Sequence, residues 1–390
     1  MFKRTKSTRI ISLITAMFML MCLFAACSEG NDGGSGDSDT PLEAERNPIR
    51  IGVLVPLSGT NAQFGNDMLN AYTLAVDEIN AAGGVLGRQL ELFPGDDGAD
   101  PGMAVQAAEL IISRNVDFVV GGYASGATIP TLQQFYDADL MMLISASNST
   151  RITELGLPHF MINSPGSHAV ITLADLCKYL GVTSAALIHQ GCSYSQDLSD
   201  LSAAELPKHG IEIATVEVMA AGTPDVSAIV TSINNSGADF VYWCGYPADG
   251  SNVIRQLRSG GYEGYIAVGD GSASTELIDF SGEAGEGVFV TSPPFVEFAV
   301  GGEEFVANYI AKFGDEPGTY DTLCYDTIYL LKAAIEKAGT TQTAAVRDAV
   351  QGIEYKGLSG TIRFTPEREP ELSNFIVLKI ENGRFALVEV

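Results

Sequence analysis

The sequence predicts an α/β protein with two doubly wound lobes, each a parallel sheet covered by helices. From Ile51 onward, short apolar runs bounded by Gly, Pro or Asp alternate with amphipathic segments of helical length, which is typical of βαβ units. This alternation completes one series and then restarts in a second series of similar length. About 350 residues follow the N-terminal region, more than one hydrophobic core usually organises. Two lobes are therefore expected.

The first lobe is expected to open with a strand at residues 51–56. Residues 65–82 follow with apolar side chains at helical spacing, and they end at Gly83-Gly84, where a helix should stop. The same alternation then predicts strands at 90–93, 117–120 and 141–145. It predicts helices between them at 103–114 and 125–138.

The second lobe is expected after residues 160–166, where the pattern restarts. Its helices are predicted at 168–180, 194–209, 226–236 and 249–259, and its strands at 185–189, 212–218, 240–243 and 265–268. The remaining chain predicts helices at 302–313, 320–338 and 341–352, then strands at 361–364, 375–380 and 385–390. Because these late helices follow a completed second lobe, their docking on the first lobe would make the chain cross between the lobes several times.

The N-terminus has the pattern of a secretion signal. Lys3, Arg4, Lys6 and Arg9 precede an uncharged run over residues 10–26, which is shorter than the roughly 20 apolar residues that span a bilayer. The sequence LFAAC at residues 23–27 resembles the bacterial lipobox, except that Phe24 replaces an aliphatic residue; the resemblance implies a diacylated Cys27. We therefore expect a signal peptide at 1–26 and a flexible tether at 27–47, with ordinary signal-peptide cleavage as the alternative.

Charge and cysteine usage exclude several classes of protein. The net charge is −26, and removal of residues 1–26 would take four positive charges with it, so nucleic acid and anionic lipid should be repelled. Cys177, Cys192, Cys244 and Cys324 show neither CxxC spacing nor pairing with histidine at metal-ligand spacing. We expect no metal and no cofactor, and the four thiols could be free or paired in three ways.

Catalytic motifs are missing from the sequence. GxSxG, GxxxxGK[ST], HExxH and a GxGxxG placed on a strand-to-helix turn do not occur, and the four histidines are dispersed. Because no nucleophile comes with a recognisable base, we expect no catalytic residues and no enzyme activity.

Several motifs in order resemble the leucine/isoleucine/valine-binding proteins of ABC importers. They are IGVLVPLSG at 51–59, NAAGGVLG at 80–87, Asp96-Asp97, VVGG at 119–122 with Ser125 and Thr128, and YDTIYLL at 325–331 with Ala334. The resemblance extends to about residue 390. It implies the type I periplasmic-binding-protein fold, in which three crossover strands form a hinge and a ligand is enclosed between the lobes. Ala99 and Ala124 stand where that family has a first-lobe disulfide.

The resemblance also implies where the chain divides. The crossings are expected near 162–166, 291–295 and 357–363. Residues 48–163 with 294–358 would form the first lobe, and 164–293 with 359–390 the second, unless the C-terminal strands return to the first lobe.

Ser125 and the sequence 145–149 (SASNS) each follow a strand of the first lobe. Ligands of open α/β sheets bind beyond the carboxyl ends of the strands. There a serine at a helix N-terminus can offer a hydroxyl and backbone N–H groups to a carboxylate. The family resemblance implies that Ser125 binds the ligand carboxylate and that Ser147, Asn148 and Ser149 contact both ends of an amino acid. The alternatives are an ordinary N-cap serine and a turn.

Asp270 lies between two glycines after the last parallel strand expected in the second lobe. The resemblance implies that it pairs with the ligand's α-ammonium group, as a charge-assisted hydrogen bond in a desolvated site; the alternative is an Asp-Gly turn. Phe64, Tyr194 and Tyr246 match aromatic positions that cover the ligand in the family. Gln63 and Asp97 are expected as turn and loop residues, and Arg151 as a solvated one.

The function expected from these residues is binding and delivery of a small amino acid, with an apolar and above all a branched side chain favoured. The partners would be an ABC permease and its ATPase, with the membrane reached only through the lipid anchor and the protein acting outside the cytoplasm as a monomer. Alternatives are a ligand-sensing module of the same fold, or an importer receptor for an amide, a urea-like compound, a short peptide or an aromatic acid.

Overall fold

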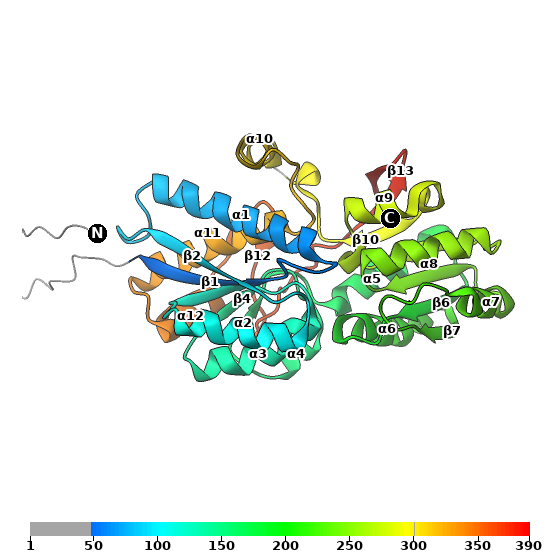
Figure 1. Ribbon diagram of the computed structural model, residues 1–390, viewed down its shortest axis with the longest axis horizontal. Coiled ribbons are helices and arrows are strands. Elements are labelled where there is room, and N and C mark those ends of the chain that lie inside the picture. Colours follow the sequence, from blue (N-terminus) through cyan, green and yellow to red (C-terminus); the bar gives the residue numbers. More distant parts are fainter. Residues whose placement is uncertain (1–47, 300) are drawn as a thin grey trace, which may run out of the picture. The chain divides into compact units, whose positions relative to one another are not determined.

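Two separate sheets organise the computed structural model, which describes residues 48–299 and 301–390 (Figure 1). The expected signal peptide at 1–26, the tether at 27–47 and the lipidation site Cys27 lie outside the described residues. The described residues form one compact unit.

The first lobe has a five-stranded parallel sheet in the order β2-β1-β3-β4-β5. Its strands are β1 (Ile49–Val55), β2 (Leu90–Asp96), β3 (Phe118–Gly121), β4 (Met142–Ile144) and β5 (Phe160–Met161). The helices between them are α1 (Ala62–Ala81), α2 (Pro101–Ser113), α3 (Ser125–Asp137) and the short α4 (Arg151–Glu154). Strands β3, β4 and β5 are buried along their whole length because helices cover both faces of the sheet.

The second lobe has a seven-stranded sheet in the order β14-β13-β10-β9-β8-β6-β7, in which β13 and β14 are antiparallel. Its strands are β6 (Ser184–His189), β7 (Glu212–Val218), β8 (Phe240–Cys244), β9 (Tyr265–Val268), β10 (Phe289–Ser292), β13 (Ile376–Glu381) and β14 (Arg384–Val388). Its helices are α5 (Gly166–Leu180), α6 (Ser193–Glu205), α7 (Ser227–Ser236), α8 (Pro247–Ser259) and α9 (Thr275–Ser281). Helix α9 does not appear among the elements expected from the sequence, and β10 overlaps the crossing expected near 291–295.

The late helices return to the first lobe. They are α10 (Gly302–Phe313), α11 (Asp321–Ala338) and α12 (Thr343–Gln351). Leu323, Ile328 and Val346 belong to the same buried cluster as Ile51 and Met68, so α11 and α12 complete the core beside α1. Docking of this part of the chain on the first lobe is what the sequence pattern suggested.

The third crossing differs from the expectation at 357–363. That stretch lies in a hairpin of β11 (Tyr355–Gly357) and β12 (Gly360–Ile362), and Ile362 and Phe364 pack in the first-lobe core. The chain therefore enters the second lobe between Phe364 and β13. The strand expected at 361–364 is observed as β12, which begins one residue earlier and ends at Ile362. Both C-terminal strands lie in the second lobe.

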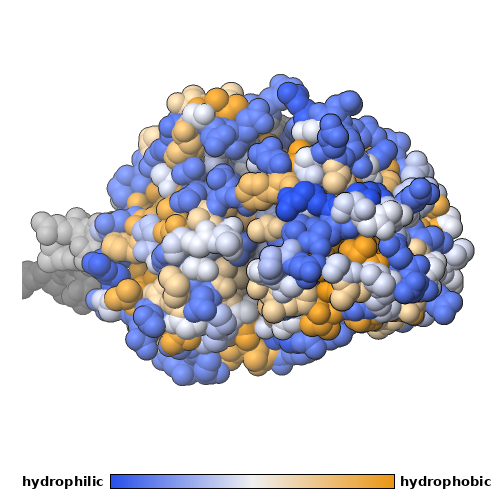
Figure 2. All heavy atoms as spheres, turned by 45° about the vertical axis from the view of Figure 1, so that its right-hand side comes forward, coloured by the Kyte–Doolittle hydropathy of each residue, from blue (hydrophilic) through white to orange (hydrophobic). Residues whose placement is uncertain are grey.

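The described part of the chain contains four cysteines and a surface of mixed polar and apolar residues (Figure 2). Among the described residues, Cys177, Cys192, Cys244 and Cys324 are all free thiols, and all but Cys192 are buried. Hydrophilic residues cover much of the face drawn in Figure 2, with apolar ones scattered among them. Within 48–299 and 301–390, no helix combines the length and the apolarity needed to cross a bilayer.

Candidate functional site

Ser125 is the first residue of α3 and follows the positive-φ pair Gly121 and Gly122 at the end of β3. Its side chain is fully buried. The Ser125 hydroxyl oxygen accepts a hydrogen bond from the Ser149 backbone N–H at 3.3 Å. The glycines let the chain turn from strand to helix within a few residues, so the start of α3 is held against the loop that follows β4.

The loop after β4 carries the three polar residues predicted for ligand contact, and all three are buried. Ser147 shares a hydrogen bond of 2.8 Å with Thr128 Oγ1 of α3. Asn148 Nδ2 donates to Asp270 Oδ2 at 2.9 Å, and Ser149 Oγ donates to Asp197 Oδ2 at 2.9 Å. Since Asp270 and Asp197 belong to the second lobe, this loop contacts that lobe directly.

Asp270 lies two residues after the end of β9, with 1 % of its surface exposed. Tyr194 Oη donates to its Oδ1 at 2.9 Å, and Tyr320 Oη to its Oδ2 at 3.1 Å. Asn148 and Asn163 complete the set on Oδ2, at 2.9 and 3.3 Å. Oδ1 thus accepts one hydrogen bond and Oδ2 three, so Oδ1 is the oxygen with acceptor capacity to spare.

Burial and hydrogen bonds act in opposite directions on the pKa of Asp270. Removal from water raises the pKa of this carboxyl, while the hydrogen bonds from Tyr194, Asn148, Tyr320 and Asn163 oppose the rise. A cationic group placed at Oδ1 would favour the charged carboxylate and lower the pKa again. The site is therefore chemically suited to a ligand that carries an ammonium group.

Five aromatic rings form a row from the first lobe to the second. Phe64 stacks on Tyr123 with ring centroids 4.5 Å apart and lies 6.0 Å from Tyr320. Tyr123 lies 5.6 Å from Tyr246, which in turn lies 5.6 Å from Tyr194. The predicted residues Phe64, Tyr194 and Tyr246 are thus brought together by a ring that was not predicted, and the row offers a large apolar contact surface.

Glycines beside Asp270 make room for the Tyr194 ring. A Cβ at Gly271 would lie 2.6 Å from Tyr194 Cε1, and one at Gly269 would lie 2.7 Å from its Oη. The Gly271 backbone N–H donates to Tyr194 Oη at 2.9 Å, while that hydroxyl donates to Asp270. The sequence Gly269-Asp270-Gly271 is therefore required by side-chain packing and is more than a turn.

Sequence reasoning missed four residues of this site. Tyr123 donates to the Gly271 carbonyl at 3.0 Å across the lobes, and Tyr320 and Asn163 donate to Asp270. Tyr123 lies between Gly122 and Ser125, so its position after β3 could have identified it. Tyr320 lies directly before α11 and Asn163 on the expected first crossing, but Asp197 lies inside α6 with no signal in the sequence.

The three weaker candidates have other surroundings. Gln63 is exposed and donates to Asp67, and Arg151 lies 3.9 Å from Asp200 in an exposed ion pair. Asp97 is fully buried, and burial raises the pKa of its carboxyl to about 7. Its Oδ1 accepts from the Ala99 N–H at 2.8 Å, so it stabilises the loop after β2.

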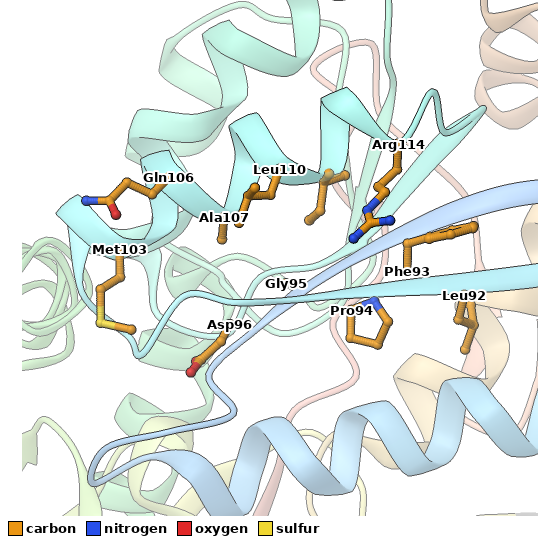
Figure 3. Close-up of a pocket in the computed structure, with 11 residues that line it drawn as sticks. Leu92, Phe93, Pro94, Gly95, Asp96, Met103, Gln106, Ala107, Leu110 and Arg114 are labelled. Carbon is orange, nitrogen blue, oxygen red and sulfur yellow. The ribbon is translucent and has the colours of Figure 1, made fainter. Parts of the chain in front are cut away.

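Two cavities lie outside the Asp270 cluster. One of about 500 Å³ lies between β2 and α2, where Met103, Leu110 and Arg114 line it (Figure 3). It contains none of the predicted site residues. A second of about 520 Å³ borders Phe64 and Thr319 and includes residues of both lobes. Among the described residues, no group of three or more His, Cys, Asp or Glu side chains could hold a metal ion.

Known proteins match the chain over almost all of its described length. A family profile described as periplasmic binding protein matches residues 48–384. The Leu/Ile/Val-binding protein homolog 2 of Brucella abortus is 28% identical over 367 residues, covering 93% of this chain and 96% of that protein. The chain also resembles, at 25% identity and a TM-score of 0.82, the crystal structure of the leucine-binding protein LivK of Thermotoga maritima, with 87% of this chain and 98% of that one covered.

A more distant structure shares the fold alone. The solute-binding protein of R. palustris in complex with benzoate is 16% identical with a TM-score of 0.79, covering 87% of this chain and 95% of that one. The two lobes and these matches agree with the fold and family expected from the motifs. The chain belongs to the periplasmic binding protein family and has the type I fold of that family.

Proposed function

We propose that this chain is the extracytoplasmic solute-binding component of an ABC importer and that it encloses a small amino acid between its lobes. The observation that carries the proposal is the buried carboxylate of Asp270, which lies where the two lobes meet and keeps an acceptor position on Oδ1. A simple carboxylic acid would be repelled there, whereas an α-ammonium group would be held by a charge-assisted hydrogen bond.

The other end of the ligand is assigned to the first lobe. Ser125 lies at the N-terminus of α3, where backbone N–H groups and the helix dipole favour an anion. Ser147 and Ser149 lie beside it. A zwitterion oriented with its carboxylate toward α3 and its ammonium toward Asp270 would satisfy both lobes, and this supports an amino acid over an amide or an aromatic acid.

The aromatic row favours an apolar side chain. Phe64, Tyr123 and Tyr246 present ring faces, and the described cluster around Asp270 includes no Lys or Arg donor to that carboxylate. The Brucella relatives are named for leucine, isoleucine and valine. We therefore place branched-chain and similar amino acids first among the ligands.

A ligand panel tests this function. Thermal-shift and calorimetric titrations of the purified chain would compare apolar, polar and charged amino acids, amides, urea-like compounds, dipeptides and aromatic acids. We expect saturable 1:1 binding of an apolar amino acid, with a rise in melting temperature that grows with ligand concentration. Binding of an amide or an aromatic acid with no amino acid bound would overturn the ligand assignment, and no binding at all would overturn the transport role.

Delivery and location complete the proposal. The chain would be anchored through a lipid on Cys27, act as a monomer without catalysis, and hand its ligand to a membrane permease with its ATPase. Metabolic labelling with a radioactive fatty acid, followed by membrane fractionation, tests the anchor. Copurification with a permease encoded beside it tests the partner.

A further inference from the structure

The carboxylate of Asp197 connects the two lobes at a point beside the predicted ligand site. Asp197 belongs to α6 of the second lobe and is 7 % exposed. Its partners are on the first lobe. Ser149 Oγ donates to Oδ2 at 2.9 Å, the Thr150 backbone N–H donates to Oδ2 at 2.7 Å, and Thr150 Oγ1 donates to Oδ1 at 2.9 Å.

These contacts make Asp197 different from an ordinary surface carboxylate. No Lys, Arg or His of the described chain lies within ion-pair distance of it. Its charge is instead stabilised by three donors from two consecutive residues of the opposite lobe. Hydrogen bonds to an ionised acceptor are about twice as strong as neutral ones, so this contact holds the loop after β4 more firmly than neutral partners would.

The same loop is held at its other end by the second carboxylate. Asn148 donates to Asp270 at 2.9 Å, so three successive side chains, those of residues 148–150, all donate to carboxylates of the second lobe. The Asn148 carbonyl also accepts from the Gly166 N–H at 2.8 Å. Asp197 therefore fixes the position of the loop relative to both Asp270 and α3.

We propose that Asp197 is a positioning residue that holds the loop of residues 148–150 in its binding geometry and keeps the lobes closed over the ligand. This inference rests on the proposed function, because it assigns the loop to ligand binding. Opening the lobes breaks all three hydrogen bonds to Asp197 and returns the carboxylate to water. A ligand that leaves through an opened cleft does so at a rate set partly by this contact, whereas the rate of ligand entry into the open form does not depend on it.

Asp200 provides a matched control on the same helix. It lies one turn after Asp197 and also faces the first lobe, through Arg151 at 3.9 Å, but its side chain is 64 % exposed. An exposed ion pair of this kind contributes little. Asp197→Asn and Asp200→Asn thus make the same chemical change at a buried and an exposed contact between the same two segments.

The first measurement needs no ligand. Backbone amide hydrogen exchange of Thr150 reports the N–H bond to Asp197 directly. We expect exchange at Thr150 to be roughly 10-fold to 100-fold faster in Asp197→Asn than in the wild type, and unchanged in Asp200→Asn. Equal exchange in both variants would overturn the proposal whether or not an amino acid is bound.

The second measurement uses the amino acid that binds best in the ligand panel. Stopped-flow kinetics should show dissociation roughly 10-fold to 100-fold faster in Asp197→Asn, with the association rate unchanged.

Thr150→Val keeps Asp197 and the backbone amide of residue 150 but removes the hydroxyl donor, and a smaller increase in the dissociation rate is expected. If the Asp197 variant does not fold, this second variant decides: dissociation at the wild-type rate would overturn the proposal. A wild type that binds no amino acid would refute the proposed function, while the exchange measurement would still stand.

Discussion

Asp270 shows how a single buried group can set the ligand preference of a whole cleft. Its carboxyl is removed from water and is compensated by four neutral donors, so its charged form is disfavoured relative to an exposed aspartate. A ligand ammonium group would supply the positive charge that these neutral donors lack. The preference for a zwitterion therefore follows from burial as much as from the identity of the residue.

A pH dependence of binding follows at this residue. The pKa of Asp270 is raised in the ligand-free protein, and an ammonium ligand binds its charged form, so binding releases protons when the pH is near that raised pKa. We predict that affinity falls as the pH is lowered through it. Calorimetry in buffers of different ionisation enthalpy measures the protons released.

Two variants control this experiment. In Asp270→Asn the proton release should disappear. In Asp97→Asn it should persist, although burial raises the pKa of Asp97 to about 7 as well. If proton release persisted in Asp270→Asn and disappeared in Asp97→Asn, the titrating carboxyl would be Asp97, and the prediction would be wrong.

Sequence reasoning reached part of this cluster for a physical reason. Asp270, Ser125 and the loop at 147–149 directly follow strands, and the ends of parallel strands meet at one edge of a sheet. Tyr320 and Asp197 come from the start and the interior of helices, and only the packing of the two lobes brings them to the same place. Contacts of that kind leave no local pattern in the chain.

The first βα unit is held together by a close backbone approach in α1. Gly65 lies in the first turn of that helix, and a Cβ there would come within 1.7 Å of the Pro56 carbonyl oxygen. Gly126 lies in the first turn of α3, where a Cβ would meet only Ser193 Oγ at 3.9 Å. The two glycines occupy similar helical positions with opposite surroundings.

We predict that Gly65→Ala destabilises the protein by about 2–4 kcal/mol, because α1 must shift away from β1. Gly126→Ala should change the free energy of unfolding by less than about 1 kcal/mol. Urea unfolding monitored by circular dichroism measures both. Equal stability of the two variants would show that α1 and β1 are not packed as described.

Two buried carboxyls on helices make stability depend on pH. Burial raises the pKa of both Asp67 in α1 and Asp321 at the start of α11, and the negative charge of Asp321 adds to the rise at Asp67. For Asp67 the pKa rises to about 8. Between pH 3.8, the ordinary pKa of this carboxyl, and about pH 8, its pKa in the folded protein, the folded state binds more protons than the unfolded state. The free energy of unfolding therefore falls as the pH rises through this range.

The substitution Asp67→Asn should remove this loss of stability at high pH. We predict that the variant melts roughly 2–4 °C higher than the wild type at pH 9 and that the difference shrinks toward pH 4. Melting curves across that range measure it. If the difference in melting temperature grew as the pH was lowered, the pKa of Asp67 would not be raised in the folded protein.

At the level of elements, most of the parallel strands and their helices could be predicted, because buried strands and amphipathic helices have distinct hydrophobic periods. Helix α9 has seven residues, fewer than two full helical turns, so its period does not stand out. The hairpin of β11 and β12 was read as one later strand, although Gly357 and the dipeptide Ser359-Gly360 mark its turn in the sequence.

In the described chain, each lobe is completed by segments that are distant from the rest of that lobe in the sequence. Helices α10 to α12 complete the first lobe, and β13 and β14 complete the second. Three segments therefore connect the lobes, which suits a hinge that closes over a ligand. The number of crossings followed from the family resemblance, but the place of the third did not, because Ile362 and Phe364 could be assigned to a core only once the cores were known.

The central claim is that a zwitterionic ligand spans the lobes with its ammonium group on Asp270. Calorimetry of the wild type and of Asp270→Asn, with the best-binding amino acid and with the same compound lacking its amino group, tests it most directly. We predict that the variant loses roughly 2 kcal/mol or more, about 30-fold, for the amino acid and nothing for the compound without the amine. Equal losses for both compounds, or a wild type that prefers the compound without the amine, would contradict the account.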